Sequence, residues 1–130
     1  MSTGKKHILI VEDDRASTLY FKELVHSIHI AGVEMEVDHV FTGEKAVDFC
    51  KKHTVDLVLM DIKLPGIDGL MATRMIKEND PDVVVIAQSA YAMSDDYKRA
   101  MDAGSDDYLA KPVSPGTFKE RLEKHLRGSH

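Results

Sequence analysis

Acidic, hydroxyl and amine side chains follow four short apolar runs of this 130-residue sequence. The residues are Glu12, Asp13 and Asp14, then Asp61, Ser89 and Lys111. An apolar run of about four to eight residues that is bounded by turn residues predicts a buried β-strand. The carboxyl ends of parallel strands meet at one edge of a sheet, where open α/β proteins bind their ligands. We therefore expect these side chains to converge on Asp61.

Several carboxylates in one pocket repel one another, so one of them must be protonated or a cation must be present. Mg²⁺ suits the second option, because it prefers oxygen ligands, keeps some of its waters and accepts phosphate oxygens. Asp13 and Asp61 are the natural direct ligands, and Glu12 would hold a metal-bound water. Lys111 and the Ser89 hydroxyl would then hold a dianionic group attached to Asp61. A carboxylate can accept a phosphoryl group, and catalysis would consist of positioning and charge neutralisation.

Each of these residues also has an ordinary structural interpretation when it is taken alone. The acidic stretch 12–14 could cap a helix, Lys111 could be a solvated surface charge, and Ser89 could simply end a strand. Their shared position at strand ends is what favours a common site. The edge strand is expected to contribute no residue to it.

The elements that must position this site are read from the apolar pattern and the turn residues. Strands are predicted at residues 7–11, 35–40, 55–61, 83–87 and 107–110. A helix is predicted after each strand, at about 15–30, from 42, from 68, at 94–104 and from 114. Asp68, Ser94 and Ser114 are suitable capping residues. In the third helix, Met71 and Met75 are expected to fill the core.

This alternation of strands and helices predicts one domain with a parallel sheet that is covered on both faces. Residues 35–40 alternate apolar and polar side chains, which is typical of a half-exposed edge strand. With right-handed crossovers, an edge position for the second strand favours the order 2-1-3-4-5. The predicted fold is therefore a single doubly wound, five-stranded parallel sheet of the flavodoxin-like type, a three-layer α/β/α sandwich.

The composition excludes several classes of protein. A formal net charge of −5 disfavours nucleic acid binding and provides no polybasic surface for a membrane. No apolar segment reaches the length of a membrane helix, and the polar start is no signal peptide. The single cysteine, Cys50, cannot form an internal disulfide, which predicts a reducing compartment and a cytoplasmic location. Residues 127–130 resemble the start of an expression tag, so the domain is expected to span residues 1–126.

Four segments taken together resemble the receiver domain of two-component response regulators, the CheY-like family. They are I-L-I-V-E-D-D, L-V-L-M-D-I-K-L-P-G-I-D-G, I-A-Q-S-A and D-Y-L-A-K-P. The resemblance extends over residues 6–126. In detail, the sequence is similar to the receivers of hybrid histidine kinases. The resemblance implies that Asp61 is the phosphoacceptor and that Mg²⁺ binds Asp13, Asp61 and the backbone carbonyl of Lys63. Glu12 and Ser89 stand where Asp and Thr are commoner in the family.

The resemblance also implies a switch. Lys111 would bind the phosphoryl group, Ser89 would be the switch hydroxyl, and Tyr108 would be the aromatic rotamer switch. The Lys111–Pro112 bond is expected to be cis. A bulky Tyr91, two residues after Ser89, would shield the acyl phosphate from water.

The readout would be a change in the surface formed by residues 91–103, the strand 107–110 and the last helix, through a shift between two pre-existing states. The implied partners are a histidine kinase or histidine phosphotransfer protein and a downstream effector. The chain is expected to be a signalling domain rather than an enzyme, and a monomer or weak dimer.

Rival interpretations come from other classes of protein. An aspartyl-nucleophile phosphohydrolase of the haloacid dehalogenase type would have D-x-D at the nucleophile, but the second position here is Lys63. A metal-dependent nuclease would also require D-x-D. A flavodoxin would need a hydroxyl- and glycine-rich loop after the first strand, where this chain has the acidic residues 12–14. A phosphorylation-independent interaction module would not need Ser89 and Lys111 at strand ends.

Overall fold

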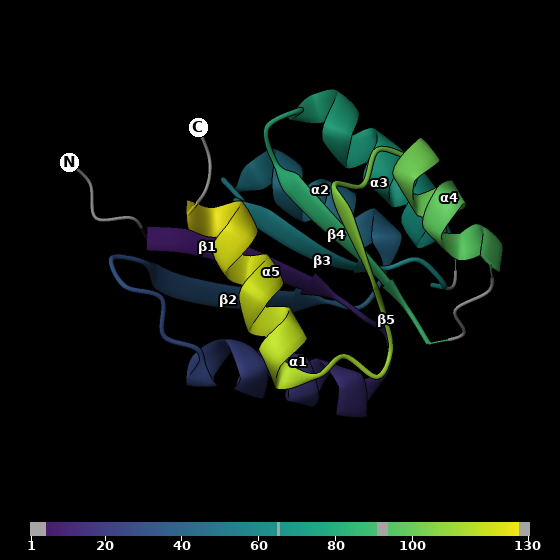
Figure 1. Cartoon of the computed structure of the whole chain (residues 1–130). Helices are drawn as coiled ribbons and strands as arrows, with labels where there is room; N and C mark the ends of the chain where they lie inside the picture. Colours follow the sequence, from purple (N-terminus) through teal and green to yellow (C-terminus); the bar gives the residue numbers. More distant parts are fainter. Residues whose placement is uncertain (1–4, 65, 91–93, 128–130) are drawn as a thin grey trace.

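Five parallel strands form one sheet in the computed structural model, in the order β2-β1-β3-β4-β5 (Figure 1). The strands are β1 (Lys5–Val11), β2 (Glu34–Val40), β3 (Leu57–Asp61), β4 (Val84–Ser89) and β5 (Asp107–Ala110). The helices are α1 (Arg15–Ser27), α2 (Gly43–Lys52), α3 (Gly69–Asn79), α4 (Ser94–Asp102) and α5 (Pro115–Arg127). Helices α1 and α5 cover one face of the sheet, and α2, α3 and α4 cover the other. The predicted fold and strand order are confirmed.

The structure describes residues 5–64, 66–90 and 94–127. The predicted shielding role of Tyr91 and the predicted tag residues 128–130 lie outside this part of the chain. Within it, no helix is long and apolar enough to cross a bilayer.

The central strand β3 is buried along its whole length, and its side chains alternate between the two layers of helices. Leu57 and Leu59 belong to the core that α1 and α5 cover, whereas Val58 and Met60 belong to the core under α2 and α3. By the same alternation, Asp61 faces the α1 and α5 layer. Strand β2 is only partly buried, as expected for an edge strand.

Short polar side chains cap the helices that follow β1 and β3. Asp14 accepts a hydrogen bond from the Ser17 backbone nitrogen (2.9 Å), and Asp68 accepts one from that of Met71 (2.9 Å). The hydrogen bonds from Ser17 hold the pKa of Asp14 below its usual value. Asp14 therefore serves α1, which leaves Glu12 and Asp13 as the acidic residues available to a site.

Two details of the sequence prediction are wrong. Helix α1 ends at Ser27 rather than near Ile30, because the Ile28 amide donates to the carbonyls of Leu24 and Val25 and the chain then turns. In α3, Met71 and Met75 are 49% and 38% exposed. The buried face of α3 is instead formed by small residues and one isoleucine, namely Gly69, Ala72, Thr73 and Ile76.

A partly buried carboxylate at the start of β5 joins this strand to α5. Asp107 accepts hydrogen bonds from Arg121 (2.7 Å) and His125 (2.9 Å). Burial raises the pKa of Asp107. The hydrogen bonds from His125 and the Tyr108 amide and the charge of Arg121 lower it by more, so the net shift is downward. The ionised carboxylate therefore favours the folded state.

We expect Asp107→Asn to lower the unfolding free energy by about 1–2 kcal/mol at neutral pH, because a hydrogen-bonded charge is lost. A lowered pKa stabilises the fold above the unfolded value near 4, and this contribution is lost as the pH falls through the folded pKa. The difference between the two proteins should therefore shrink in acid. Urea denaturation from pH 7 downward measures it, with the exposed change Glu23→Gln in α1 as the control. A difference independent of pH would contradict the assignment.

Candidate functional site

Three carboxylates converge at the carboxyl edge of the sheet. Glu12, Asp13 and Asp61 each offer an oxygen, and these oxygens lie within 4.8 Å of one another. Glu12 and Asp61 are 1% and 7% exposed, whereas Asp13 is exposed. The predicted acidic cluster is therefore present, and it lines a cavity of about 280 Å³.

This environment strongly shifts the pKa of the Asp61 carboxyl group. Burial raises its pKa to about 7, and the negative charge of Glu12 adds to this effect. The Lys63 backbone N–H, which donates to Asp61 Oδ1 at 2.9 Å, and the charge of Lys111 act in the opposite direction. A hard divalent cation would relieve the repulsion and favour the carboxylate form. Three clustered carboxylates are the oxygen donors that Mg²⁺ prefers, so the donor set fits this ion.

Lys111 lies in the site, but its amine contacts Glu12 rather than Asp61. Its Nζ is 2.9 Å from Glu12 Oε1 and 3.2 Å from Ser17 Oγ, and the Phe21 ring lies below it at 6.0 Å. The Lys111–Pro112 bond is cis, as expected. A cation is thus held beside the carboxylates, within reach of a group attached to Asp61.

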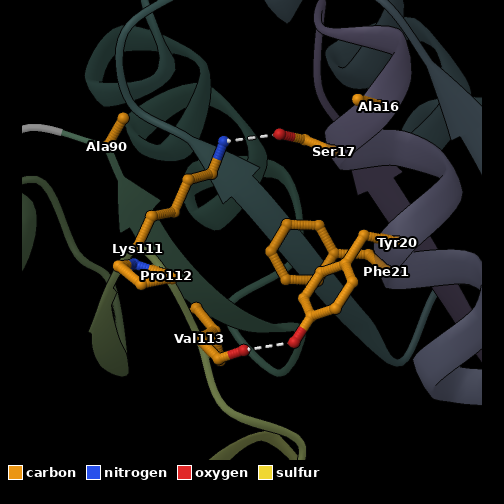
Figure 2. A pocket seen from close by; sticks show the side chains of 8 residues that line it. All are labelled: Ala16, Ser17, Tyr20, Phe21, Ala90, Lys111, Pro112 and Val113. Atoms are coloured by element: carbon orange, nitrogen blue, oxygen red, sulfur yellow. Dashed lines mark hydrogen bonds between the residues drawn. The ribbon is translucent and has the colours of Figure 1, made fainter.

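A larger cavity of about 560 Å³ adjoins the acidic one, with Ser17, Ala90 and Lys111 lining both. Figure 2 shows its mainly apolar wall, where the Tyr20 hydroxyl donates to the Val113 carbonyl at 2.6 Å. It holds no carboxylate, so we place the chemistry in the smaller cavity.

Ser89 and Tyr108 lie on the side of the sheet that α4 covers. The buried Ser89 hydroxyl donates to Asp96 Oδ2 at 3.3 Å. The Tyr108 ring packs with Ala87 and Ala100 and meets the exposed ring of Tyr97 edge-on at 6.1 Å. Burial and the nearby charge of Asp96 raise the pKa of Tyr108.

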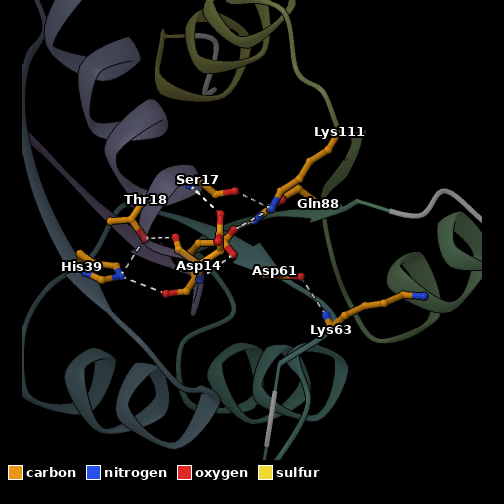
Figure 3. A network of polar contacts seen from close by, with 9 residues as sticks. Asp14, Ser17, Thr18, His39, Asp61, Lys63, Gln88 and Lys111 are labelled. Carbon is orange, nitrogen blue, oxygen red and sulfur yellow. Dashed lines mark hydrogen bonds and ion pairs between the residues drawn. The ribbon is translucent and has the colours of Figure 1, made fainter.

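Asp96 connects Ser89 and Tyr108 to the loop after Asp61. It is 1% exposed and lies 3.6 Å from the Lys63 ammonium. In Figure 3 the Lys63 side chain extends away from Asp61, while its backbone nitrogen bonds the carboxylate. Lys63 therefore joins the loop to α4 as well as holding Asp61.

Sequence reasoning missed several residues of this network (Figure 3). Among the described residues, none from the edge strand β2 lines the acidic cavity. His39 of β2 nevertheless supports the backbone next to it, because its Nε2 lies 3.0 Å from the Glu12 carbonyl oxygen and 3.2 Å from Thr18 Oγ1. Gln88 donates to Glu12 Oε1 at 3.0 Å. A polar residue in an otherwise apolar strand was the available signal for Gln88, and the first-turn position of Asp96 indicated only a favourable helix charge.

Known proteins with similar sequences are receiver domains and response regulators. A family model described as the response regulator receiver domain matches residues 8–123. The polar-differentiation response regulator DivK of Brucella anthropi is 32% identical over 123 residues, which cover 93% of this chain and 96% of DivK.

Two solved structures extend the comparison. The receiver domain of the sensor histidine kinase PA1611 from Pseudomonas aeruginosa, solved with a magnesium ion in its active-site cleft, is 33% identical with a TM-score of 0.84. The alignment covers 97% of this chain and 100% of that one. The receiver domain of Ssk1 from Saccharomyces cerevisiae, crystallised with the histidine phosphotransfer protein Ypd1, has a TM-score of 0.80 at 22% identity. The alignment covers 96% of this chain and 91% of that one, and shows a shared fold.

Proposed function

Because this chain belongs to the response regulator receiver domain family, we propose that Asp61 accepts a phosphoryl group in a two-component phosphorelay. The observation that carries the proposal is the position of Asp61, a buried carboxylate within 4.8 Å of two others and next to a lysine-bound glutamate. Residues 1–126 would form the functional unit. We place it in the cytoplasm, as the single cysteine predicts.

Mg²⁺ would be held by Asp13, Asp61 and the Lys63 carbonyl, with Glu12 acting through a water, and would supply charge neutralisation. An Asp61 oxygen would form the new bond to phosphorus while the bond from phosphorus to the donor histidine nitrogen breaks. The Lys63 amide fixes the rotation of the carboxylate through Oδ1. Lys111 would move from Glu12 to the phosphoryl oxygens and balance their charge.

The phosphoryl group on Asp61 would also draw the Ser89 hydroxyl away from Asp96. Because the Ser89 hydroxyl and Tyr108 lie on the α4 side, their repacking would alter the α4-β5-α5 surface. Tyr97, which is 58% exposed and contacts the Tyr108 ring, would report this change to an effector. Such a switch biases an equilibrium between two states.

The proposed partners are a histidine kinase or histidine phosphotransfer protein as donor and an effector protein as reader. The fold shared with the Ssk1 receiver, which was crystallised with such a phosphotransfer protein, supports this choice. We propose a monomer or weak dimer that binds no nucleic acid directly. Its only reactions would be phosphorylation and dephosphorylation of its own aspartate.

We expect the chain to gain the mass of one phosphoryl group when it is incubated with acetyl phosphate and Mg²⁺. The adduct should be absent when a chelator removes the metal, because the carboxylate repulsion then opposes the incoming anion. Intact mass spectrometry measures both results. No adduct on the wild-type chain would overturn the proposal. Rapid release of many phosphate equivalents per chain would instead favour a phosphohydrolase.

A further inference from the structure

Gln88 is a buried amide beside the phosphoacceptor, and the function proposed above gives it no role. It is 0% exposed and pairs with Asp61 in the register between β3 and β4. In-register neighbours of adjacent strands point to the same face of a sheet. Val11 pairs with Met60, so Glu12 takes the next position, beside Asp61. Glu12, Asp61 and Gln88 therefore form one row across three strands.

The amide of Gln88 acts as a donor in this row. Its Nε2 donates to Glu12 Oε1 at 3.0 Å, and the Lys111 ammonium donates to the same oxygen at 2.9 Å (Figure 3). The opposite orientation of the amide would place two acceptors together. The other oxygen of Glu12 accepts from the Asp14 amide at 3.2 Å. Among the residues that the structure describes, three donors thus hold Glu12, and Gln88 is the neutral side chain of the three.

The other end of the same amide is unfavourable for stability. Gln88 Oε1 is buried and accepts no hydrogen bond from any residue that the structure describes. A buried acceptor without a donor destabilises a fold, and an apolar side chain of similar size would avoid that loss. Local departures of this kind are found mainly at functional sites. Core packing alone therefore does not explain a glutamine here, and the one hydrogen bond of its side chain to a described residue goes to Glu12.

We propose that Gln88 is a positioning residue that keeps the Glu12 carboxylate in place for the metal site. The inference rests on the proposed function. There, Lys111 turns from Glu12 toward the phosphoryl group on Asp61, and Glu12 Oε1 loses its charged donor. Gln88 remains beside it, because it is fixed in β4 and has no other described partner for its Nε2 group. The Glu12 carboxylate, which would hold a water of the metal, would then stay in the same position in both states.

The first test is Mg²⁺ titration by calorimetry with Gln88→Leu. We expect the dissociation constant for Mg²⁺ to rise about tenfold, since replacing a residue that orients a metal-site group typically weakens metal binding by roughly 10- to 100-fold. The thermal midpoint without Mg²⁺ should stay the same or rise. A role in core packing alone would instead lower the midpoint and leave Mg²⁺ affinity unchanged.

Ser105→Ala is the matched control. The Ser105 hydroxyl is also buried and without a partner among the described residues, but it lies in the turn between α4 and β5. Its removal should leave Mg²⁺ affinity unchanged. If Gln88→Leu does not fold, Gln88→Met removes the same donor from a side chain of similar length and takes its place.

A double-mutant cycle links the effect to Glu12. In the Glu12→Gln background, Gln88→Leu should cause no further loss of Mg²⁺ affinity, because the carboxylate that it positions is gone. With beryllofluoride, a phosphoryl analogue that occupies Lys111, the effect of Gln88→Leu should be larger than without it.

The outcomes separate the two claims. Equal Mg²⁺ affinity of the wild type and Gln88→Leu would overturn the role of Gln88 and leave the proposed function standing. The role of Gln88 would also be overturned if Gln88→Leu weakened Mg²⁺ binding equally in the Glu12→Gln background. The same holds if beryllofluoride did not increase the loss of Mg²⁺ affinity that Gln88→Leu causes. A wild-type chain that binds no Mg²⁺ would overturn the metal site itself, and the inference with it.

Discussion

Asp61→Asn should abolish the phosphoryl adduct completely, because an amide in place of the carboxylate offers no nucleophilic oxygen to phosphorus. The substitution preserves shape and the hydrogen bond from the Lys63 amide to Oδ1. The fold should therefore persist. Intact mass after incubation with acetyl phosphate and Mg²⁺ measures the result. An adduct that persists on Asp61→Asn would place the phosphoacceptor elsewhere in the chain.

The same variant should be more stable than the wild type when no metal is bound. The pKa of Asp61 is raised to about 7, so ionisation at neutral pH opposes folding, and Asn removes this loss. We expect a gain on the order of 2 kcal/mol at pH 8 in a chelating buffer. The gain should decline as the pH falls from 7 to 4 and vanish below, where Asp61 is protonated in both the folded and unfolded chain. Asp82→Asn, an exposed change of the same type, should show neither effect.

Gly69→Ala should be the most destabilising single-methyl change at the site. A Cβ at Gly69 would lie 2.2 Å from the Asp61 carbonyl oxygen and 2.5 Å from the Ile62 Cα. Both neighbours are backbone atoms, so the end of β3 and the start of α3 would have to separate. We expect the unfolding free energy to fall by about 3 kcal/mol, measured by urea denaturation.

Gly116→Ala provides the comparison for this change. A Cβ there meets nothing within 4 Å, and alanine is the better helix former, so stability should rise by about 0.5 kcal/mol. If Gly69→Ala were as stable as the wild type, the close contact between α3 and Asp61 would not be a constraint on the loop.

The sequence was sufficient for the fold because β1, β3 and β4 are marked by apolar runs that lead into polar residues, and β2 by the alternation of an edge strand. Asp61 and Lys111 could be placed at one edge of the sheet for the same reason, since parallel strands share the direction of their ends. Which partner each side chain takes could not be predicted. That Lys111 contacts Glu12, and Ser89 contacts Asp96, depends on rotamers and helix positions that strand patterns do not encode.

Other errors have equally local causes. Met75 follows the helical period of a core residue, but the small Ala72 and Thr73 form the packed face of α3 and leave Met75 partly exposed. Gln88 lies just beyond the predicted strand 83–87, and its proposed role depends on the register with Asp61, which the apolar pattern does not specify. Tertiary packing decided both cases.

The alternation of side chains along β4 sets a strict limit on the length of this strand. Gln88 and Ser89 are adjacent, yet one contacts Glu12 on the α1 and α5 side and the other contacts Asp96 on the α4 side. Inserting or deleting one residue between Val84 and Gln88 would exchange these faces, because side chains in a strand alternate with a period of two. The amide would then face α4 and the hydroxyl would face Glu12. A single-residue insertion or deletion would therefore uncouple the acidic cluster from α4, the helix that we propose reports on it.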